Sequence, residues 1–206
     1  MQGFADKSIA IVGLGLIGGS LARALRVANP VQTILAVDND PQALQQALDA
    51  GVITRACDLD AAAEQADLLV LAIPPLLIEK LLPELPALLN AHCVVTDVGS
   101  AKEQIVAAVA SLDADFRARF VPGHPIAGSE QSGFGAARAD LFAERKVILT
   151  PSADNNSNSV ALVHEMWRRI GAEVMGMSVL RHDQVLAATS HLPHVLAFAL
   201  VDSLLQ

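Results

Sequence analysis

The sequence predicts an α/β fold built on a doubly wound, mainly parallel β-sheet, followed by the start of an all-helical part. Up to about residue 150, short β-branched runs alternate with stretches rich in alanine and leucine, which is typical of successive βαβ units. The alternation stops after Ser178, and the remaining residues are expected to be helical. We therefore expect one domain at 1–178 and the first part of a second domain at 179–206.

Each strand is expected where a short apolar run is bounded by polar residues or glycine. The predicted strands lie at 8–12, 33–37, 68–72, 93–96, 119–121 and 147–149. Between them, apolar residues recur at intervals of three and four, which predicts helices at 16–27, 41–50, 76–89 and 102–112. The polar segment 154–159 is interpreted as a surface loop, followed by a helix over about 160–170 and a short strand near 173–175.

The composition favours a soluble globular protein. Apolar residues make up 52% of the 206 residues and charged residues only 17%, which argues against a disordered chain. The uncharged segments 8–22 and 68–78 are interrupted by four glycines and two adjacent prolines, respectively. Neither reaches the roughly 18 to 20 apolar residues that cross a bilayer, so no membrane span is expected.

The charge and the cysteines restrict the partners and the compartment. A net charge of −8, without a run of lysine or arginine and without tyrosine, argues against a nucleic-acid-binding surface. Cys57 and Cys93 lie far apart without the spacing of a metal site, as expected for thiols in a reducing compartment. We predict a cytoplasmic protein whose partners are small molecules or proteins.

A glycine-rich turn between the first strand and the first helix predicts a Rossmann-type dinucleotide site. Gly13 permits the tight turn, Gly15 lets a pyrophosphate approach the backbone, and Gly18 allows the helix to pack closely on the strand. Backbone N–H groups at the helix start would hold the phosphates. The predicted cofactor-binding residues are Gly13, Gly15, Leu16, Ile17, Gly18 and Asp38.

Asp38 ends the second predicted strand, 20 residues after Gly18, and favours NAD as the cofactor. Its carboxylate would accept hydrogen bonds from the ribose hydroxyls and repel a 2′-phosphate. Residues 39–41 supply no arginine that could bind such a phosphate.

Two segments with polar residues, 96–100 and 123–125, come at the ends of two further predicted strands. The nicotinamide ring and the substrate are expected to meet at this edge of the sheet. His124 is the best acid/base candidate, because an ordinary pKa of about 6.5 suits taking a hydroxyl proton while hydride leaves the same carbon. Ser100 either orients the substrate or caps a helix in the capping box of residues 100–103. Asp97 is interpreted as a buried loop anchor.

The remaining histidines fall into two groups. His92, His164 and His182 are expected to be exposed and are assigned no role. His191 and His194 lie three residues apart near a helix start, but nearby carboxylate or thiolate ligands are lacking. Anion or substrate binding is therefore favoured over zinc, and no metal site is predicted.

Four segments, in order, carry a family resemblance: Gly-Leu-Gly-Leu-Ile-Gly-Gly-Ser at 13–20, Thr-Asp-Val-Gly-Ser-Ala-Lys at 96–102, Gly-His-Pro-Ile-Ala-Gly-Ser-Glu at 123–130 with Ser-Gly at 132–133, and Ser-His-Leu-Pro-His at 190–194. Together they resemble the prephenate/arogenate (cyclohexadienyl) dehydrogenases of tyrosine biosynthesis over nearly the whole chain. Many dehydrogenases share the first segment, whereas the two histidine-proline segments together are specific to this family.

The resemblance implies NAD-dependent oxidative decarboxylation of prephenate to 4-hydroxyphenylpyruvate, or of arogenate to tyrosine. It implies that His124 takes the hydroxyl proton and that Ser100 helps to orient the substrate. The substrate-binding residues implied by the resemblance are Ser129, Glu130, Ser190, His191 and His194.

The family usually continues through a helical domain that forms a homodimer and supplies an arginine for a substrate carboxylate, and this sequence stops before both. Residues 179–206 would be the first part of that dimerisation domain. Without the arginine, a substrate carboxylate is left to Lys102, Arg138 or a protonated histidine, so weak or no turnover is expected of these residues alone.

Two alternatives stay open beside this interpretation. One is another small-acid dehydrogenase or imine reductase on the same scaffold, which gives no reason for the pair of His191 and His194. The other is a nucleotide-binding regulatory module without turnover, which would bind NAD but no diacid. The choice between prephenate and arogenate is also open, and Glu130 is the obvious acidic group that could favour the arogenate ammonium.

Overall fold

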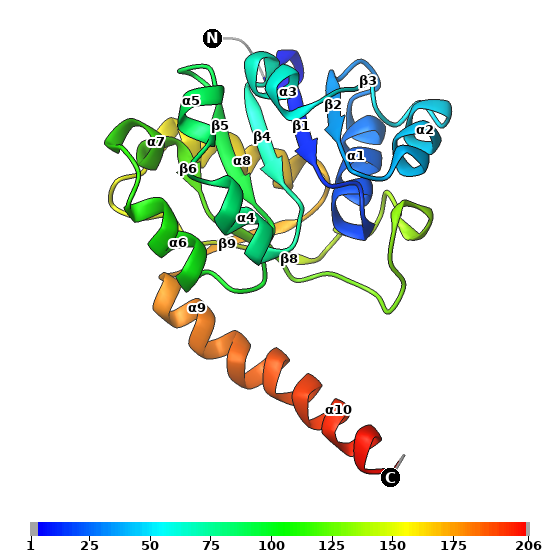
Figure 1. The fold of residues 1–206 in the computed structure, drawn as a ribbon, viewed down its shortest axis with the longest axis vertical. Coiled ribbons are helices and arrows are strands. Elements are labelled where there is room, and N and C mark those ends of the chain that lie inside the picture. Colours follow the sequence, from blue (N-terminus) through cyan, green and yellow to red (C-terminus); the bar gives the residue numbers. More distant parts are fainter. Residues whose placement is uncertain (1–3, 205–206) are drawn as a thin grey trace.

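The computed structural model describes residues 4–204, apart from the side chains of His191 and His194, and it confirms the α/β fold with a parallel sheet (Figure 1). Six parallel strands pair in the order β3-β2-β1-β4-β5-β6. Their bounds are β1 (Ile9–Val12), β2 (Ile34–Val37), β3 (Arg55–Ala56), β4 (Leu68–Leu71), β5 (Val94–Asp97) and β6 (Phe120–Val121). The strand order reverses between β1 and β4, where sheets of this type bind their ligands.

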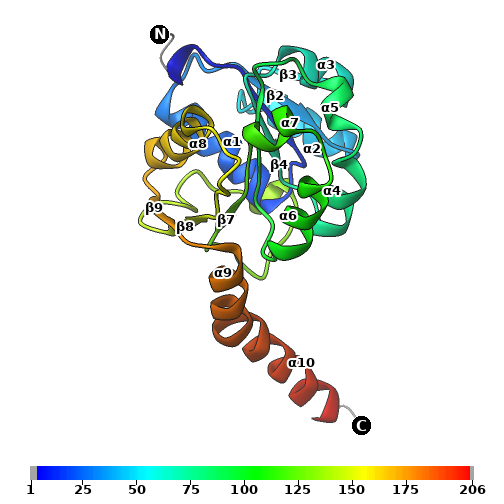
Figure 2. The ribbon, with the colours of Figure 1, turned by 90° about the vertical axis from the view of Figure 1, so that its left-hand side faces the viewer.

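Helices cover both faces of the sheet, which explains the continuous apolar strands. Ile9 and Ile11 of β1 point into one core, and Ala10 and Val12 point into the other. The helices flanking the strands are α1 (Leu16–Ala28), α2 (Pro41–Asp49), α3 (Leu59–Gln65), α4 (Pro75–Leu81), α5 (Leu85–Leu88), α6 (Glu103–Ala110) and α7 (Ala114–Arg119). Figure 2 shows α1 and α8 (Ser157–Arg169) on one side of the sheet and α4, α5 and α6 on the other.

The chain between 122 and 176 forms a second, three-stranded sheet, which the sequence did not distinguish from the first. Its strands are β7 (Gly123–Pro125), β8 (Lys146–Leu149) and β9 (Glu173–Gly176), in that order. β7 and β8 are antiparallel, whereas β8 and β9 are parallel and joined through α8. Pro122, which has no N–H for a ladder, separates β6 from β7.

Other differences from the predicted elements have local causes. The single helix expected at 76–89 is two helices, because Pro83 has no N–H to continue the first one. β3, α3 and α7 were not predicted, because they are very short. Asp58 caps α3 and Asp113 caps α7, so each capping aspartate was the available signal. Two 3-10 turns, Phe4–Asp6 and Phe134–Ala136, complete this part of the chain.

A long helix at the C-terminal end of the described residues extends away from the part of the chain that forms the two sheets (Figure 1). It comprises α9 (Val179–Leu186), a π-helical turn (Ala187–His191) and α10 (Leu192–Leu204). The widened turn precedes Pro193, whose missing N–H cannot complete a regular helical hydrogen bond. The division of the chain into domains at residue 178 stays a prediction.

The outer part of this helix is apolar and exposed. Val195, Phe198 and Leu204 are 62%, 76% and 77% exposed. By length and composition alone, Val179–Leu204 could cross a membrane, although core helices of soluble proteins pass the same test. The expectation of no membrane span was based on segments 8–22 and 68–78 and did not consider this longer helix as a candidate.

Candidate active site

The glycine turn after β1 has a geometry that only glycine allows at two positions. Gly13 has a φ of 97°, and a Cβ there would lie 2.5 Å from the carbonyl oxygen of Ala72. A Cβ on Gly18 would lie 1.9 Å from the carbonyl oxygen of Gly13, so α1 could not pack this closely on the turn. A Cβ on Gly15 would meet open space within 4 Å. No side chain caps α1, and Leu16 and Ile17 are in its first turn.

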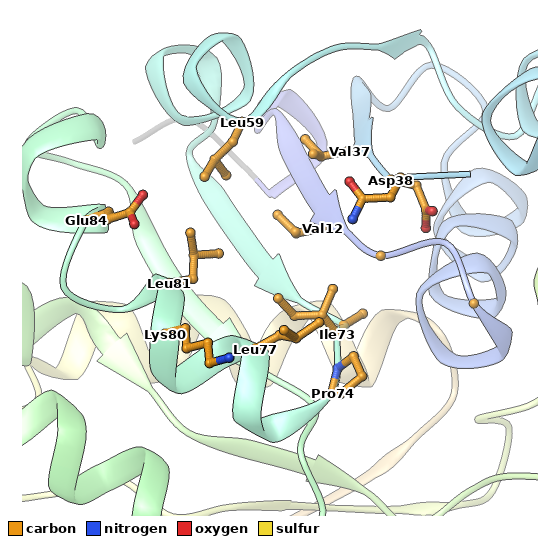
Figure 3. Close-up of a pocket in the computed structure, with 14 residues that line it drawn as sticks. Val12, Val37, Asp38, Leu59, Ile73, Pro74, Leu77, Lys80, Leu81 and Glu84 are labelled. Atoms are coloured by element: carbon orange, nitrogen blue, oxygen red, sulfur yellow. The ribbon is translucent and has the colours of Figure 1, made fainter. Parts of the chain in front are cut away.

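A cavity of about 600 Å³ opens beside this turn, at the carboxyl ends of β1, β2 and β4 (Figure 3). Leu59, Leu77 and Leu81 give it an apolar wall, and Lys80 and Glu84 also line it. The residues of this apolar wall were not identified from the sequence. They lie on α3, on α4 and on the segment that follows α4, outside the glycine-rich motif.

Asp38 stands at the edge of this cavity and is tied to the glycine turn. Its carboxylate accepts hydrogen bonds from the backbone N–H groups of Leu14 and Asp40. Each bond uses a different oxygen, so the orientation of the carboxylate is fixed, and each oxygen keeps acceptor capacity for a hydroxyl group. These residues fit a dinucleotide whose ribose lies against Asp38.

A second cavity of about 270 Å³ adjoins the first and brings His124 and Ser100 together. Ala72 and Ile73 line both cavities, so the two are neighbours at the same edge of the sheet. Ile17 of α1 lines the second cavity as well. The two predicted catalytic residues therefore face a space next to the predicted nucleotide site.

Ser100 is exposed and is not a helix cap, so the capping-box interpretation is wrong. Helix α6 begins at Glu103, and no side chain of its own N-cap residue, Lys102, closes it. Instead, the carboxylate of Asp183 accepts the N–H of Glu103 at 2.8 Å and that of Lys102 at 3.1 Å. A residue 80 positions away in sequence thus caps α6, which leaves the Ser100 hydroxyl outside this role.

His182 was expected to be exposed, but it is completely buried against His124. Nδ1 of His124 lies 2.9 Å from Nε2 of His182, and Nδ1 of His182 lies 2.6 Å from an oxygen of Asp183. Burial tends to raise the pKa of Asp183, but hydrogen bonds from His182, Glu103 and Lys102 outweigh it and hold that pKa below its ordinary value. His124, His182 and Asp183 form what we call the histidine chain.

Asp97 and Lys102 form a fully buried ion pair beneath the loop that carries Ser100. Nζ of Lys102 also donates to the carbonyl oxygen of Gly123 at 2.8 Å, and Asp97 accepts the N–H of Gly99 at 2.8 Å. Burial lowers the pKa of Lys102, and the Asp97 carboxylate opposes that effect. The loop-anchor interpretation of Asp97 is confirmed, whereas Lys102 is not available to a substrate carboxylate.

Of the other predicted substrate residues, Ser129 and Glu130 lie apart from the cavity of His124. Ser129 and Glu130 are exposed and line a separate hollow with Leu16 and Arg138. Ser190 is half-buried in the π-helical turn, and the side chains of His191 and His194 lie outside the described residues. Within residues 4–204, as far as described, no group of three or more histidine, cysteine or acidic side chains could hold a metal.

Comparisons with known proteins give one consistent answer. Residues 21–176 match the family described as prephenate dehydrogenase, nucleotide-binding domain. A cyclohexadienyl dehydrogenase of Zymomonas mobilis is 36% identical over 197 residues, covering 95% of this chain and 66% of that protein. A prephenate dehydrogenase of Bacillus subtilis is 35% identical over 199 residues, covering 94% of this chain and 53% of that protein.

A solved structure agrees with these matches. The prephenate dehydrogenase of Aquifex aeolicus, in complex with hydroxyphenyl propionate and NAD+, superposes with a TM-score of 0.88 at 36% identity. The superposition covers 97% of this chain and 69% of that one. The chain thus spans about half to two thirds of the curated relatives' length. It belongs to the prephenate dehydrogenase family, whose nucleotide-binding domain it contains.

Proposed function

We propose that this protein catalyses the NAD-dependent oxidative decarboxylation of prephenate to 4-hydroxyphenylpyruvate, of arogenate to tyrosine, or of both. The observation that carries the proposal is the pair of adjoining cavities. One is lined by the glycine turn and Asp38, and the other by His124 and Ser100. The relatives are named as prephenate and cyclohexadienyl dehydrogenases, which supports both substrates.

The cofactor we propose is NAD, bound by Gly13, Gly15, Leu16, Ile17, Gly18 and Asp38. The N–H groups that begin α1 would hold the pyrophosphate. The Asp38 carboxylate, already oriented by Leu14 and Asp40, would accept the ribose hydroxyls and repel a 2′-phosphate. When bound, NAD supplies the hydride acceptor. Titration calorimetry with NAD and NADP tests the choice, and tighter binding of NADP would contradict it.

His124 is the proposed general base. It takes the proton of the ring hydroxyl while hydride leaves the carbon that carries this hydroxyl. The bond to the ring carboxylate then breaks, carbon dioxide leaves, and the electron pair of that bond completes the aromatic ring as the ring carbonyl becomes a phenolate. The phenolate takes back the proton held by His124, which gives the hydroxyl group of the product. Ser100, exposed at the same cavity, is proposed to orient the hydroxyl. Ser129, Glu130, Ser190, His191 and His194 remain proposals as substrate-binding residues.

The test is nicotinamide reduction by the full-length protein with prephenate and with arogenate, measured separately. Reduction with at least one substrate is expected, and the ratio of the two kcat/KM values gives the preference. Absence of reduction with both would contradict the proposal. If calorimetry then showed binding of NAD but of neither diacid, the protein would instead be a nucleotide-binding module.

The partner we propose, besides the substrate, is a second copy of the chain. α10 exposes apolar side chains around its circumference, which soluble proteins cover with other protein segments. We further propose a cytoplasmic location. Both cysteines are free, and burial raises the pKa of Cys93 to about 12, which keeps that thiol unreactive. Light scattering of the full-length protein tests the homodimer, and a monomer at micromolar concentration would contradict it.

A further inference from the structure

We propose that His182 and Asp183 are positioning residues that set the ring tautomer of His124 and thereby make it a base. This inference rests on the proposed function, because it takes His124 as the group that accepts the substrate proton. The two residues lie on α9, whereas His124 lies on β7 of the small sheet. The first turn of the long C-terminal helix would thus complete the catalytic group of the sheet unit.

The first step concerns Asp183, which is an acceptor in three directions. Its carboxylate accepts hydrogen bonds from the backbone N–H groups of Glu103 and Lys102, and one of its oxygens lies 2.6 Å from Nδ1 of His182. The first two bonds come from the N-terminus of α6, where the helix dipole also favours a negative charge. These contacts hold Asp183 ionised, and an ionised carboxylate has no proton to donate. The hydrogen between Asp183 and His182 therefore resides on Nδ1 of His182.

The second step follows from the chemistry of imidazole. A neutral ring carries one N–H, so His182 with a hydrogen on Nδ1 has a lone pair on Nε2. This atom lies 2.9 Å from Nδ1 of His124, which must then be the donor. We assign the tautomers from this hydrogen-bond network. His124 consequently carries its hydrogen on Nδ1 and its lone pair on Nε2, which is the nitrogen that can take a proton.

The burial of the histidine chain supports this assignment. His182 is fully buried and His124 is 9% exposed, so water does not offer Nδ1 an equivalent partner. The two rings meet edge to face, with centroids 5.1 Å apart, so the contact also fixes the plane of His124. When His124 accepts a proton, its charge lies next to a polarisable ring whose far side contacts an anion. The same contacts therefore also stabilise the protonated form.

Asp183→Asn separates this role from a structural one. Asparagine caps helices as well as aspartate does, so its amide oxygen can keep the two N–H groups of α6. Its NH2 group then faces His182 and can only donate, which reverses every hydrogen in the histidine chain. His124 would carry its hydrogen on Nε2 and could not act as a base. We expect kcat to fall by about 10²- to 10⁴-fold, with little change in NAD affinity.

The matched control is Asp113→Asn. Asp113 caps α7 through the N–H of Phe116 at 2.8 Å, so the same substitution at an equivalent cap lies outside the site. This variant should retain wild-type kcat. Nitrogen-15 NMR of the imidazole rings reads the tautomer directly, without substrate. We expect the Nδ1–H form of His124 in the wild type and in Asp113→Asn, and the Nε2–H form in Asp183→Asn.

Each of the following outcomes overturns one of the two proposals. An Nε2–H tautomer in the wild type, or an unchanged tautomer and kcat in folded Asp183→Asn, would overturn the role of the histidine chain. If Asp183→Asn does not fold, His182→Phe replaces it, since phenylalanine fills the site without a nitrogen. Unchanged kcat in that variant would likewise overturn the role. Full turnover in His124→Asn would refute the role of His124 as the base, and with it this inference. Absence of nicotinamide reduction by the wild type would instead refute the proposed function, while the tautomer measurement would still stand.

Discussion

Removing the ammonium of Lys102 should destabilise this protein more than any other single change of charge that we consider. In Lys102→Met the carboxylate of Asp97 would stay fully buried and keep only the N–H groups of Gly99 and Gly123, at 2.8 and 3.3 Å. The carbonyl oxygen of Gly123 would lose the Lys102 donor at 2.8 Å. Breaking one side of a buried pair costs about 3–5 kcal/mol.

The assay is thermal unfolding followed by circular dichroism. For a chain of this size, 1 kcal/mol lowers Tm by about 2–4 °C, so the expected shift for Lys102→Met is roughly 6–20 °C. Lys7→Met is the matched control, because Lys7 pairs with Asp67 at 2.9 Å with side chains 24% and 18% exposed. Partly exposed pairs contribute at most about 1 kcal/mol, which corresponds to a shift below about 4 °C.

The double variant Asp97→Asn with Lys102→Met tests whether the unpaired buried charge of Asp97 causes the loss of stability. Because the buried charge is then removed together with its partner, we expect the double variant to recover part of the lost stability. Equal Tm values for Lys102→Met and Lys7→Met would refute the argument. A double variant less stable than Lys102→Met alone would contradict this expectation. It would show that the hydrogen bonds that Asp97 accepts from Gly99 and Gly123 outweigh the cost of its buried charge.

Two further outcomes follow from the same contacts. Gly18→Ala places a Cβ 1.9 Å from the carbonyl oxygen of Gly13. We therefore expect a loss of about 3 kcal/mol in unfolding free energy and, by calorimetry, weaker NAD binding. Gly135→Ala is the control, because a Cβ there meets nothing within 4 Å, and it should change neither quantity. Because the folded state lowers the pKa of Asp183, its stabilising contribution is present above the unfolded pKa of about 3.9 and disappears as pH falls through the lower folded value. The difference in unfolding free energy between wild type and Asp183→Asn should therefore shrink as the pH falls below about 4. A difference that grows below about pH 4 would contradict this.

The central sheet could be predicted because its strands carry their own signal. β1, β2 and β4 are covered on both faces, so each appears as a continuous apolar run wherever it pairs. β5 begins with two valines and ends in the buried polar residues Thr96 and Asp97. In the second sheet, β8 and β9 were predicted as strands, but β7 carries no such local signal because it has only three residues. Its pairing with β8 joins segments more than 20 positions apart. The sheet that a short strand joins depends on residues far away in the sequence. The local pattern of apolar residues therefore does not predict it.

The candidate site divides along the same line. His124 and Ser100 could be found because each follows a strand whose carboxyl end lies at the ligand edge. The partner of His124 could not, because His182 reaches it only when α9 packs beside α6 and β7. The capping of α6 by Asp183 was missed for the same reason, and a local capping box was predicted in its place. Lys102 was considered as a cation for a substrate carboxylate because the sequence does not show that it is buried and paired with Asp97.

The most direct test of the proposed chemistry is the turnover of His124→Asn in the full-length protein, with NAD affinity measured in parallel. We expect unchanged NAD binding, since His124 lines only the smaller cavity, and a loss of about 10²- to 10⁴-fold in kcat with prephenate or arogenate. Wild-type kcat in this variant would contradict the assignment of His124 as the base.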